Sequence, residues 1–169
     1  EVDAVLTKGY VFAAEFVKDK IVLDIGCAGG YGSDYLYRHG ARKVIGIELS
    51  TEAADSAKEK FGRDNLEFFA MDATSLNFGD SLFDVVISFQ VIEHIIDYKK
   101  YLSEVRRVLK DDGFFIVSTP NKNITSPNRK KPVFPFHAKE FYPDELSLLL
   151  SKYFREVRIL GQKTVNKIY

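Results

Sequence analysis

Six short apolar runs recur along the chain, and polar or turn-forming residues separate them. The runs are Ile21–Ile25, Lys43–Ile47, Leu66–Met71, Phe83–Phe89, Phe114–Ser118 and Phe154–Leu160. Each is five to seven residues long and lacks a strict apolar–polar alternation. Runs of this kind are typical of strands that are covered on both faces of a parallel sheet. The pattern therefore predicts six buried strands.

The segments between the runs carry helix signals. Thr51–Phe61 follows an N-cap serine, Asp97 precedes a helix with an apolar face from Tyr98 to Leu109, and Pro143 opens another helix. Strands that alternate with helices predict an α/β fold, with a doubly wound, mostly parallel Rossmann-like sheet in three layers. Because no repeat or low-complexity linker interrupts this order, we expect residues 1–169 to form a single domain.

A glycine-rich turn follows the first run. Four glycines stand between residues 26 and 32, just after Asp24, and glycine lets the backbone turn sharply and approach a ligand closely. The second run ends at Glu48, 22 residues after Gly26, where a carboxylate can accept from ribose hydroxyls. This order predicts an adenosine site. A dinucleotide fingerprint, Gly-x-Gly-x-x-Gly, would need glycine at the position of Ala28.

The spacing Asp24-x-Gly26-x-x-Gly29, together with Glu48, resembles the class I S-adenosylmethionine-dependent methyltransferases. Their first motif reads roughly Asp-x-Gly-Cys-Gly-x-Gly, so Ala28 departs from it. The resemblance runs from about Tyr10 to Leu160 and implies S-adenosylmethionine as the cofactor. Such folds close with a seventh, antiparallel strand. Only nine residues follow Leu160, so we expect that strand to be short or missing.

The resemblance also implies which residues surround the cofactor. Asp72 would accept from the adenine amino group, with turn capping as its alternative role, and the Ala73 N–H would donate to a ring nitrogen. The other expected contacts are Asp24, Gly26, Cys27, Ala28 and Gly29 in the turn, Glu48 at the ribose, Leu49 and Met71 as apolar walls, Ser88, Phe89 and Gln90 beside the methionine part, and Tyr10 and Tyr31 as lids. For Tyr10, packing against the sheet is the alternative.

Two histidine-bearing segments can supply a base near the transferred methyl group. Glu93 and His94 follow the fourth run, and His137 stands near the end of a long loop, residues 120–142. Loops of this length tend to be lids or binding loops, so we expect it to select the acceptor and to be mobile without ligand. His94, His137 and Glu93 are the candidate catalytic residues, with capping or packing as the alternative for His94.

The Glu93-His94 pair resembles ubiquinone-biosynthesis O-methyltransferases and small-RNA 2′-O-methyltransferases. In the latter, a glutamate at the position of Gln90 joins the residues matching Glu93, His94 and His137 in binding a divalent metal. Gln90 offers an uncharged oxygen instead, so we expect no metal site here. A metal-dependent RNA 2′-O-methyltransferase is the alternative.

Charge and composition limit the partners. The 24 basic and 24 acidic residues cancel, so no net field draws the chain to nucleic acid or to an anionic membrane. A short basic run, residues 128–131 in the long loop, indicates an anionic group on the acceptor, with a solvated loop as the alternative. Cys27 is the only cysteine, which excludes an internal disulfide. No apolar run reaches about 18 residues and no signal-peptide pattern opens the chain, so we expect a cytoplasmic location.

These observations predict an enzyme that transfers a methyl group from S-adenosylmethionine to a small-molecule acceptor, at oxygen. One alternative is a module that binds the cofactor without turnover. An oxidoreductase is disfavoured, because Ala28 interrupts the dinucleotide pattern and the chain has no Tyr-x-x-x-Lys pair. The sequence indicates no oligomeric state.

Overall fold

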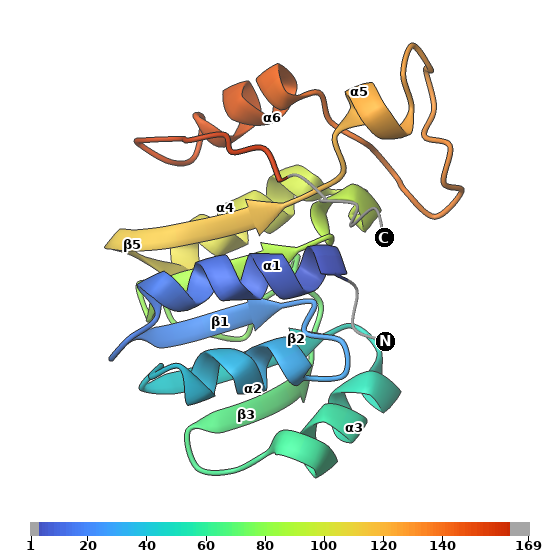
Figure 1. Cartoon of the computed structure of the whole chain (residues 1–169). Helices are drawn as coiled ribbons and strands as arrows, with labels where there is room; N and C mark the ends of the chain where they lie inside the picture. Colours follow the sequence, from blue (N-terminus) through green and yellow to red (C-terminus); the bar gives the residue numbers. More distant parts are fainter. Residues whose placement is uncertain (1–3, 163–169) are drawn as a thin grey trace, which may run out of the picture.

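The computed structural model describes residues 4–162 and is built around one parallel sheet. The strands are β1 (Ile21–Ile25), β2 (Lys43–Glu48), β3 (Leu66–Ala70), β4 (Phe83–Phe89) and β5 (Leu109–Ser118). Their order across the sheet is β3-β2-β1-β4-β5, so the chain runs outward from β1 in both directions (Figure 1). The winding reverses between β1 and β4, and ligands of such sheets bind at the carboxyl ends of the strands at this point.

Helices cover both faces of the sheet. They are α1 (Ala4–Ala13), α2 (Tyr31–Arg38), α3 (Thr51–Phe61), α4 (Tyr98–Val108), α5 (Lys122–Thr125) and α6 (Pro143–Leu150), with the short 3-10 helices η1 (Ala14–Phe16) and η2 (Ile92–His94). Among the described residues, no helix has the length and apolar character needed to cross a membrane. The segment after β5, with α5 and α6, lies beyond the β5 side of the sheet (Figure 1).

The strand side chains alternate between two hydrophobic clusters. Val85 packs with residues of α1, α2 and α3, whereas its neighbour Val86 packs with residues of α4 and α6. Val22 and Leu23 divide in the same way. Because successive strand residues point to opposite faces, a strand that is apolar throughout must be covered on both sides. The predicted fold class, a doubly wound and mostly parallel sheet in three layers, is confirmed.

Three elements differ from the sequence prediction: α1, β5 and the expected strand Phe154–Leu160. α1 was not foreseen, because its apolar residues show no clear stripe. β5 begins at Leu109 rather than at Phe114, and its pairing with β4 is irregular, since it jumps from Phe83↔Leu109 to Val85↔Phe114.

The predicted strand Phe154–Leu160 is wrong: these residues form no strand in the described part of the chain. Phe154 packs on Phe115 at 5.2 Å between ring centroids, so its apolar side chain is partly buried by packing, without a ladder of hydrogen bonds. The expectation for a closing antiparallel strand falls on residues 163–169, outside the described residues.

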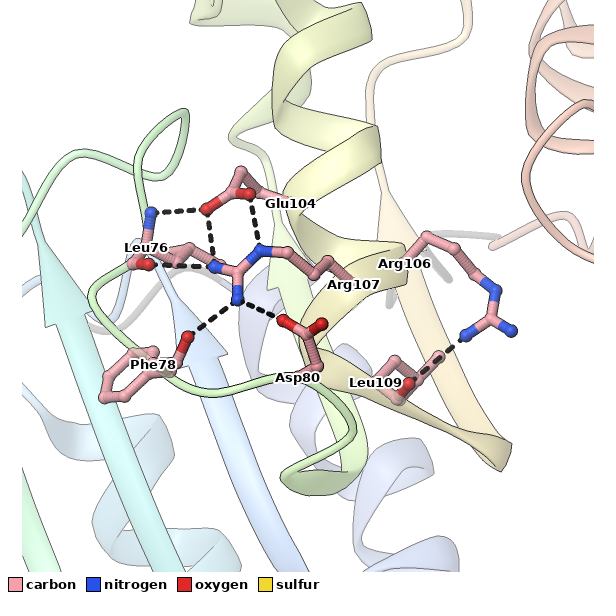
Figure 2. A network of polar contacts seen from close by, with 7 residues as sticks. All are labelled: Leu76, Phe78, Asp80, Glu104, Arg106, Arg107 and Leu109. Carbon is pink, nitrogen blue, oxygen red and sulfur yellow. Dashed lines mark hydrogen bonds and ion pairs between the residues drawn. The ribbon is translucent and has the colours of Figure 1, made fainter.

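The loop between β3 and β4 is held by a polar network centred on Arg107 of α4 (Figure 2). The Arg107 guanidinium donates to the carbonyl oxygens of Leu76 and Phe78, at 2.9 and 2.7 Å, and to both carboxylate oxygens of Glu104. Glu104 in turn accepts from Leu76 N at 2.8 Å. These bonds satisfy backbone groups of a loop that has no secondary structure, and they fix the chain that follows Asp72.

Replacing Arg107 with methionine should lower the free energy of unfolding by about 1–2 kcal/mol, because two carbonyl oxygens of the loop lose charged donors. The Arg107–Asp80 ion pair adds little, since the Asp80 side chain is 75% exposed. Urea denaturation monitored by circular dichroism would measure the change. Arg106→Met is the comparison: Arg106 donates to one carbonyl oxygen, of Leu109 at 3.2 Å, and its ion-pair partner Asp111 is 76% exposed, so a loss smaller than that of Arg107→Met is expected. Equal losses would contradict the assignment of a loop-holding role to Arg107.

Candidate functional site

The glycine turn passes directly over the end of the neighbouring strand. Gly26 N and Cys27 N both donate to Ile47 O, at 2.8 and 3.0 Å. Gly26 has φ +73°, and a Cβ on it would lie 2.4 Å from Val91 Cγ2. Residue 26 must therefore be glycine, both for its backbone angle and for the space around it. The turn brings backbone N–H groups to the edge where β1 and β2 end.

Glu48 ends β2, and its carboxylate turns back toward the glycine turn. It accepts from Ala28 N at 3.0 Å, Leu49 N at 2.8 Å and Ser50 N at 3.4 Å. A carboxylate has about four acceptor positions, so these bonds leave room for a ribose hydroxyl. Ala28 has φ +46°, so the turn keeps a left-handed conformation where the related motif has glycine.

Asp24 and Tyr10 form a buried pair beneath the turn. The Tyr10 hydroxyl donates to both carboxylate oxygens of Asp24, at 3.1 Å each, and Ser33 Oγ donates at 2.6 Å. Burial raises the pKa of Asp24 to about 6, although the hydrogen bonds from Ser33 and Tyr10 oppose this shift. Tyr10 also packs edge-on against Phe89, at 5.0 Å between ring centroids. In this structure Tyr10 thus packs against the sheet, which was the alternative for this residue, and its role as a lid over the cofactor stays a prediction.

The remaining turn-side residues differ in exposure. Tyr31 and Leu49 are 55% and 73% exposed, so both are open to a ligand or a lid. Cys27 is buried, and burial raises the pKa of its thiol well above its usual value. The thiol is thus a small apolar group within the turn. Gly29 is not crowded by its neighbours, since a Cβ there would meet only the Tyr31 ring at 3.7 Å.

The end of β3 lies beside Glu48. Ala70 pairs with Glu48, and Met71 N donates to Glu48 O at 2.9 Å. Asp72 follows at once and is exposed, and its Oδ1 accepts from Thr74 N at 2.7 Å. Asp72 therefore caps its own turn, which is the alternative role that the sequence analysis gave for it. Its second carboxylate oxygen and the N–H of Ala73 lie at the same edge of the sheet as the glycine turn.

The end of β4 stands next to β1. Ser88 pairs with Ile25, and the side chains of Ser88 and Phe89 are buried, so only their backbone can face a ligand. Gln90 has φ +58° and turns toward β5: its backbone N donates to Ser118 O at 2.9 Å and its Nε2 to Ser118 Oγ at 3.1 Å. The amide of Gln90 is thus engaged within the sheet.

A second cluster forms where η2 meets the segment after β5. Ala138 N and Lys139 N donate to the carbonyl oxygen of Glu93, at 2.7 and 3.1 Å. This contact brings His137 against His94, with ring centroids 5.0 Å apart and ring planes at 79°. The structure therefore brings together the three residues, Glu93, His94 and His137, that the sequence named as catalytic candidates.

Each imidazole in this cluster is held through Nδ1. His94 Nδ1 lies 3.1 Å from Phe136 O, and His137 Nδ1 lies 2.7 Å from Glu140 Oε1. A carbonyl oxygen and a carboxylate oxygen only accept, so each Nδ1 carries a proton, and in the neutral form of each ring Nε2 keeps its lone pair. Two imidazole lone pairs are therefore available beside Glu93 for a proton or a metal ion.

Glu93 is almost fully buried, at 1% exposure, and its Oε2 accepts from Thr119 Oγ1 at 2.9 Å. Burial raises the pKa of Glu93, against the opposing effect of its hydrogen bonds and of the two histidines. One ligand atom each from Glu93, His94 and His137 lie within 4.8 Å of one another. Two imidazole nitrogens and one carboxylate oxygen are a donor set that zinc, iron and manganese accept.

Two further residues belong to the cluster, and one of them, Thr119, has no signal in the sequence. Glu140 is 1% exposed and accepts from Thr125 Oγ1 at 2.7 Å as well as from His137. Burial raises the pKa of Glu140, but the hydrogen bonds from Ser126, Thr125 and His137 outweigh it and hold the pKa below its usual value. Thr119, which donates to Glu93, is the other. For Glu140 the signal is the segment from His137 to Glu140, which resembles a His-x-x-(x)-Glu segment of the small-RNA 2′-O-methyltransferases, and this spacing alone does not distinguish a buried pair from a surface ion pair.

Comparison with known proteins gives a consistent picture. The family model described as a methyltransferase domain matches residues 23–117. A protein of Mycobacterium tuberculosis named "Probable S-adenosylmethionine-dependent methyltransferase" is 39% identical over 141 residues, which is 83% of this chain and 50% of that protein. The ubiquinone biosynthesis O-methyltransferase of Coxiella burnetii is 31% identical over 109 residues, 63% of this chain and 46% of its own length. The chain thus spans about half the length of these relatives.

Solved structures show the same fold. The YcgJ protein of Bacillus subtilis superimposes with a TM-score of 0.74 at 24% identity, over 87% of this chain and 68% of that one. The [4+2]-cyclase SpnF gives a TM-score of 0.74 at 23% identity, over 88% of this chain and 55% of that one. Since one of these neighbours is named as a cyclase, the fold by itself does not decide the reaction.

Proposed function

This chain belongs to the methyltransferase domain family, and from this premise we propose that it transfers the methyl group of S-adenosylmethionine to a hydroxyl oxygen of a small molecule. One observation carries the proposal: the Ala28–Glu48 contact at the ends of β1 and β2, and the cluster of Glu93, His94 and His137 after β4, stand at one edge of the sheet. An adenosine-binding turn at the same sheet edge as two imidazoles suits transfer to an oxygen acceptor, because a neutral imidazole takes the proton of a hydroxyl.

The proposed chemistry asks little of the protein beyond position and proton transfer. When bound, S-adenosylmethionine supplies a methyl group on a positively charged sulfur. The glycine turn, Glu48 and Asp72 would hold the adenosine, and Nε2 of His137 or His94 would take the proton of the acceptor hydroxyl as its oxygen bonds to the methyl carbon. The methyl–sulfur bond breaks in the same displacement, and the imidazolium then returns its proton to water.

The loop of residues 120–142 would select the acceptor. Its side chains near the histidine pair include Phe134 and Phe136, which are 42% and 65% exposed, and its basic residues at 129–131 are exposed. Exposed aromatic rings beside an exposed basic run favour a small acceptor that has an apolar part and an anionic group. The proposal treats residues 1–169 as one domain with this loop as its acceptor-binding element.

Incubation with methyl-labelled S-adenosylmethionine and fractionated acceptor pools tests the proposal. Labelled product in a small-molecule pool, with the label released by hydriodic acid as expected of a methyl ether, would support it. Label only in an RNA pool would favour the RNA methyltransferase instead. Calorimetric binding of S-adenosylmethionine without labelled product in any pool would indicate a binding module without turnover.

A second candidate is the same transfer assisted by a divalent metal. Glu93, His94 and His137 would hold the ion, and the donor set fits, because each neutral imidazole has a lone pair to offer and one ligand atom of each of the three residues lies within 4.8 Å of the others. The ion would lower the pKa of a bound hydroxyl. The observation that favours this candidate is the proximity of the three ligand atoms, whereas Gln90 turns toward β5 and its Nε2 donates to Ser118 Oγ at 3.1 Å.

Turnover should persist after prolonged treatment with EDTA, within about twofold of the untreated enzyme, if the imidazoles act as bases without an ion. Initial rates with and without the chelator, on the same acceptor, measure this. Loss of turnover that manganese, cobalt or zinc restores would establish the metal-assisted candidate. Calorimetry of those ions on the wild-type chain and on His94→Ala is the control, because binding through the cluster would disappear in the variant.

A further inference from the structure

We propose that Glu140 is a positioning residue that fixes the ring of His137, so that Nε2 of this histidine faces the reacting hydroxyl with its lone pair available. This inference rests on the proposed function, because it concerns the same acceptor site. Glu140 would touch neither the cofactor nor the acceptor and would act only through His137.

The contact between the two side chains is short and buried. His137 Nδ1 lies 2.7 Å from Glu140 Oε1, and the side chains are 7% and 0% exposed. Buried carboxylates are rare in proteins unless they are paired and hydrogen-bonded. Glu140 meets this condition, because the same carboxylate also accepts from Thr125 Oγ1 at 2.7 Å.

The segment around Glu140 is held in place by its neighbours on α5. Asn121 forms an isolated parallel bridge with Phe141, and Lys122 N donates to Phe141 O at 3.1 Å. Thr125 Oγ1 also lies 3.2 Å from Asn121 O. The carboxylate therefore sits between two backbone segments that are bonded to each other, and its orientation is set before any ligand binds.

The His137 ring is enclosed on its other sides by aromatic rings. Its centroid lies 5.0 Å from Phe134, 5.2 Å from Phe136 and 5.0 Å from His94. A ring enclosed in this way has one remaining freedom, a flip about χ2 that exchanges Nδ1 with Cδ2 and Nε2 with Cε1. Glu140 removes this freedom, because a flipped ring would turn Cδ2, which cannot replace the N–H donor, toward the carboxylate.

Glu140 also contributes during the transfer. As the acceptor O–H bond breaks and the O–CH3 bond forms, the proton moves to Nε2 and the ring becomes an imidazolium. The Glu140 carboxylate accepts from Nδ1–H of this imidazolium and stabilises its positive charge. In Glu140→Gln, the neutral side-chain amide would still orient the ring but would stabilise the charge less.

Nuclear magnetic resonance of chain labelled with nitrogen-15 histidine tests the positioning without any turnover. In the wild type, His137 should show one neutral tautomer with the proton on Nδ1. Glu140→Leu should abolish this single-tautomer signature, and Glu140→Gln should restore it. His39 is an internal reference, because its Nδ1 lies 2.8 Å from Tyr35 O and is remote in sequence from the cluster.

Kinetics with the acceptor found in the labelling screen give the second readout. Glu140→Leu should lower kcat about 10- to 100-fold, the range for residues that orient an active imidazole, with the affinity for S-adenosylhomocysteine unchanged. Glu140→Gln should recover part of this loss. Thr125→Val removes one hydrogen-bond donor to the Glu140 carboxylate and is the milder variant in case Glu140→Leu does not fold. It should broaden the His137 signals and lower kcat less than Glu140→Leu does. Glu145→Gln is the matched control, a carboxylate of the same segment that accepts from Tyr142 N, and kcat should not change.

The outcomes separate this inference from the proposed function. A wild type in which His137 carries its proton on Nε2, or a Glu140→Leu variant that keeps both the tautomer and kcat, would overturn the positioning role. A fall in kcat that merely follows the melting temperature and the cofactor affinity would overturn it too, because it marks a structural role. An enzyme without methyl transfer, but with the predicted tautomers in each variant, would leave Glu140 as the positioning residue and reject only the proposed reaction.

Discussion

Replacing His137 with alanine should lower kcat about 100-fold, the lower end of the range for a general base, while the affinity for S-adenosylmethionine stays the same. This loss corresponds to about 2.7 kcal/mol of transition-state stabilisation. The two effects should separate because the residues expected around the adenosine lie at the ends of β1 to β4, whereas His137 lies in the segment after β5. Initial rates at saturating cofactor give kcat, and calorimetry gives the dissociation constant.

His39→Ala is the matched control for this variant. His39 is exposed, lies at the end of α2, and has its Nδ1 2.8 Å from Tyr35 O, so its removal should change neither kcat nor cofactor affinity. Equal losses of kcat and of cofactor affinity in His137→Ala would contradict the prediction. They would show that His137 supports the fold or the cofactor pocket rather than the acceptor.

Replacing Glu48 with alanine should weaken binding of S-adenosylmethionine by about 1.5–3 kcal/mol, the range for hydrogen bonds to a charged group. Two losses contribute. The ribose hydroxyls lose their acceptor, and Ala28 N, now bonded to Glu48 at 3.0 Å, loses the contact that orients the glycine turn. Glu48→Gln retains an acceptor oxygen without the charge and should lose less. Calorimetric dissociation constants for the three chains measure the series.

A deoxyribose analogue of S-adenosylhomocysteine isolates the ribose contribution. The wild type should bind this analogue more weakly than S-adenosylhomocysteine, and Glu48→Ala should bind the two nearly equally, because the hydroxyls have no partner left to lose. Glu52→Ala, at an exposed acid in the first turn of α3, is the control and should bind as the wild type does. Full discrimination between the two ligands in Glu48→Ala would place the ribose elsewhere.

Much of the fold follows from local patterns. Five of the six apolar runs are strands of the sheet, because a strand covered on both faces needs consecutive apolar residues, and this condition is visible in the sequence. The sixth run fails for a reason that is not local: Phe154 is apolar because it packs on Phe115, and packing alone does not make a strand. α1 escaped notice because the residues that anchor it, such as Ala13, are small, and their burial depends on the sheet beneath them.

The candidate site divides in the same way. The glycine turn and Glu48 are recognisable from the sequence because a left-handed backbone at residue 26 requires glycine and because the carboxyl ends of parallel strands share one edge. The roles of Asp24 and Tyr10 are not recognisable, since an acid before a glycine turn looks the same whether it faces a ligand or a buried hydroxyl.

The sequence by itself determined the parallel sheet, the glycine turn with its acid, and three polar candidates for the acceptor side. Only the tertiary structure decided that His137 meets Glu93 and His94, that Glu140 lies buried behind His137, and that Gln90 turns away to Ser118. Turn conformation and strand burial depend on neighbours a few residues away. The cluster depends instead on η2 and the end of the loop after β5, two segments that are about forty residues apart in the sequence. Two backbone hydrogen bonds to the Glu93 carbonyl oxygen join these segments. The spacing of the residues does not indicate this contact.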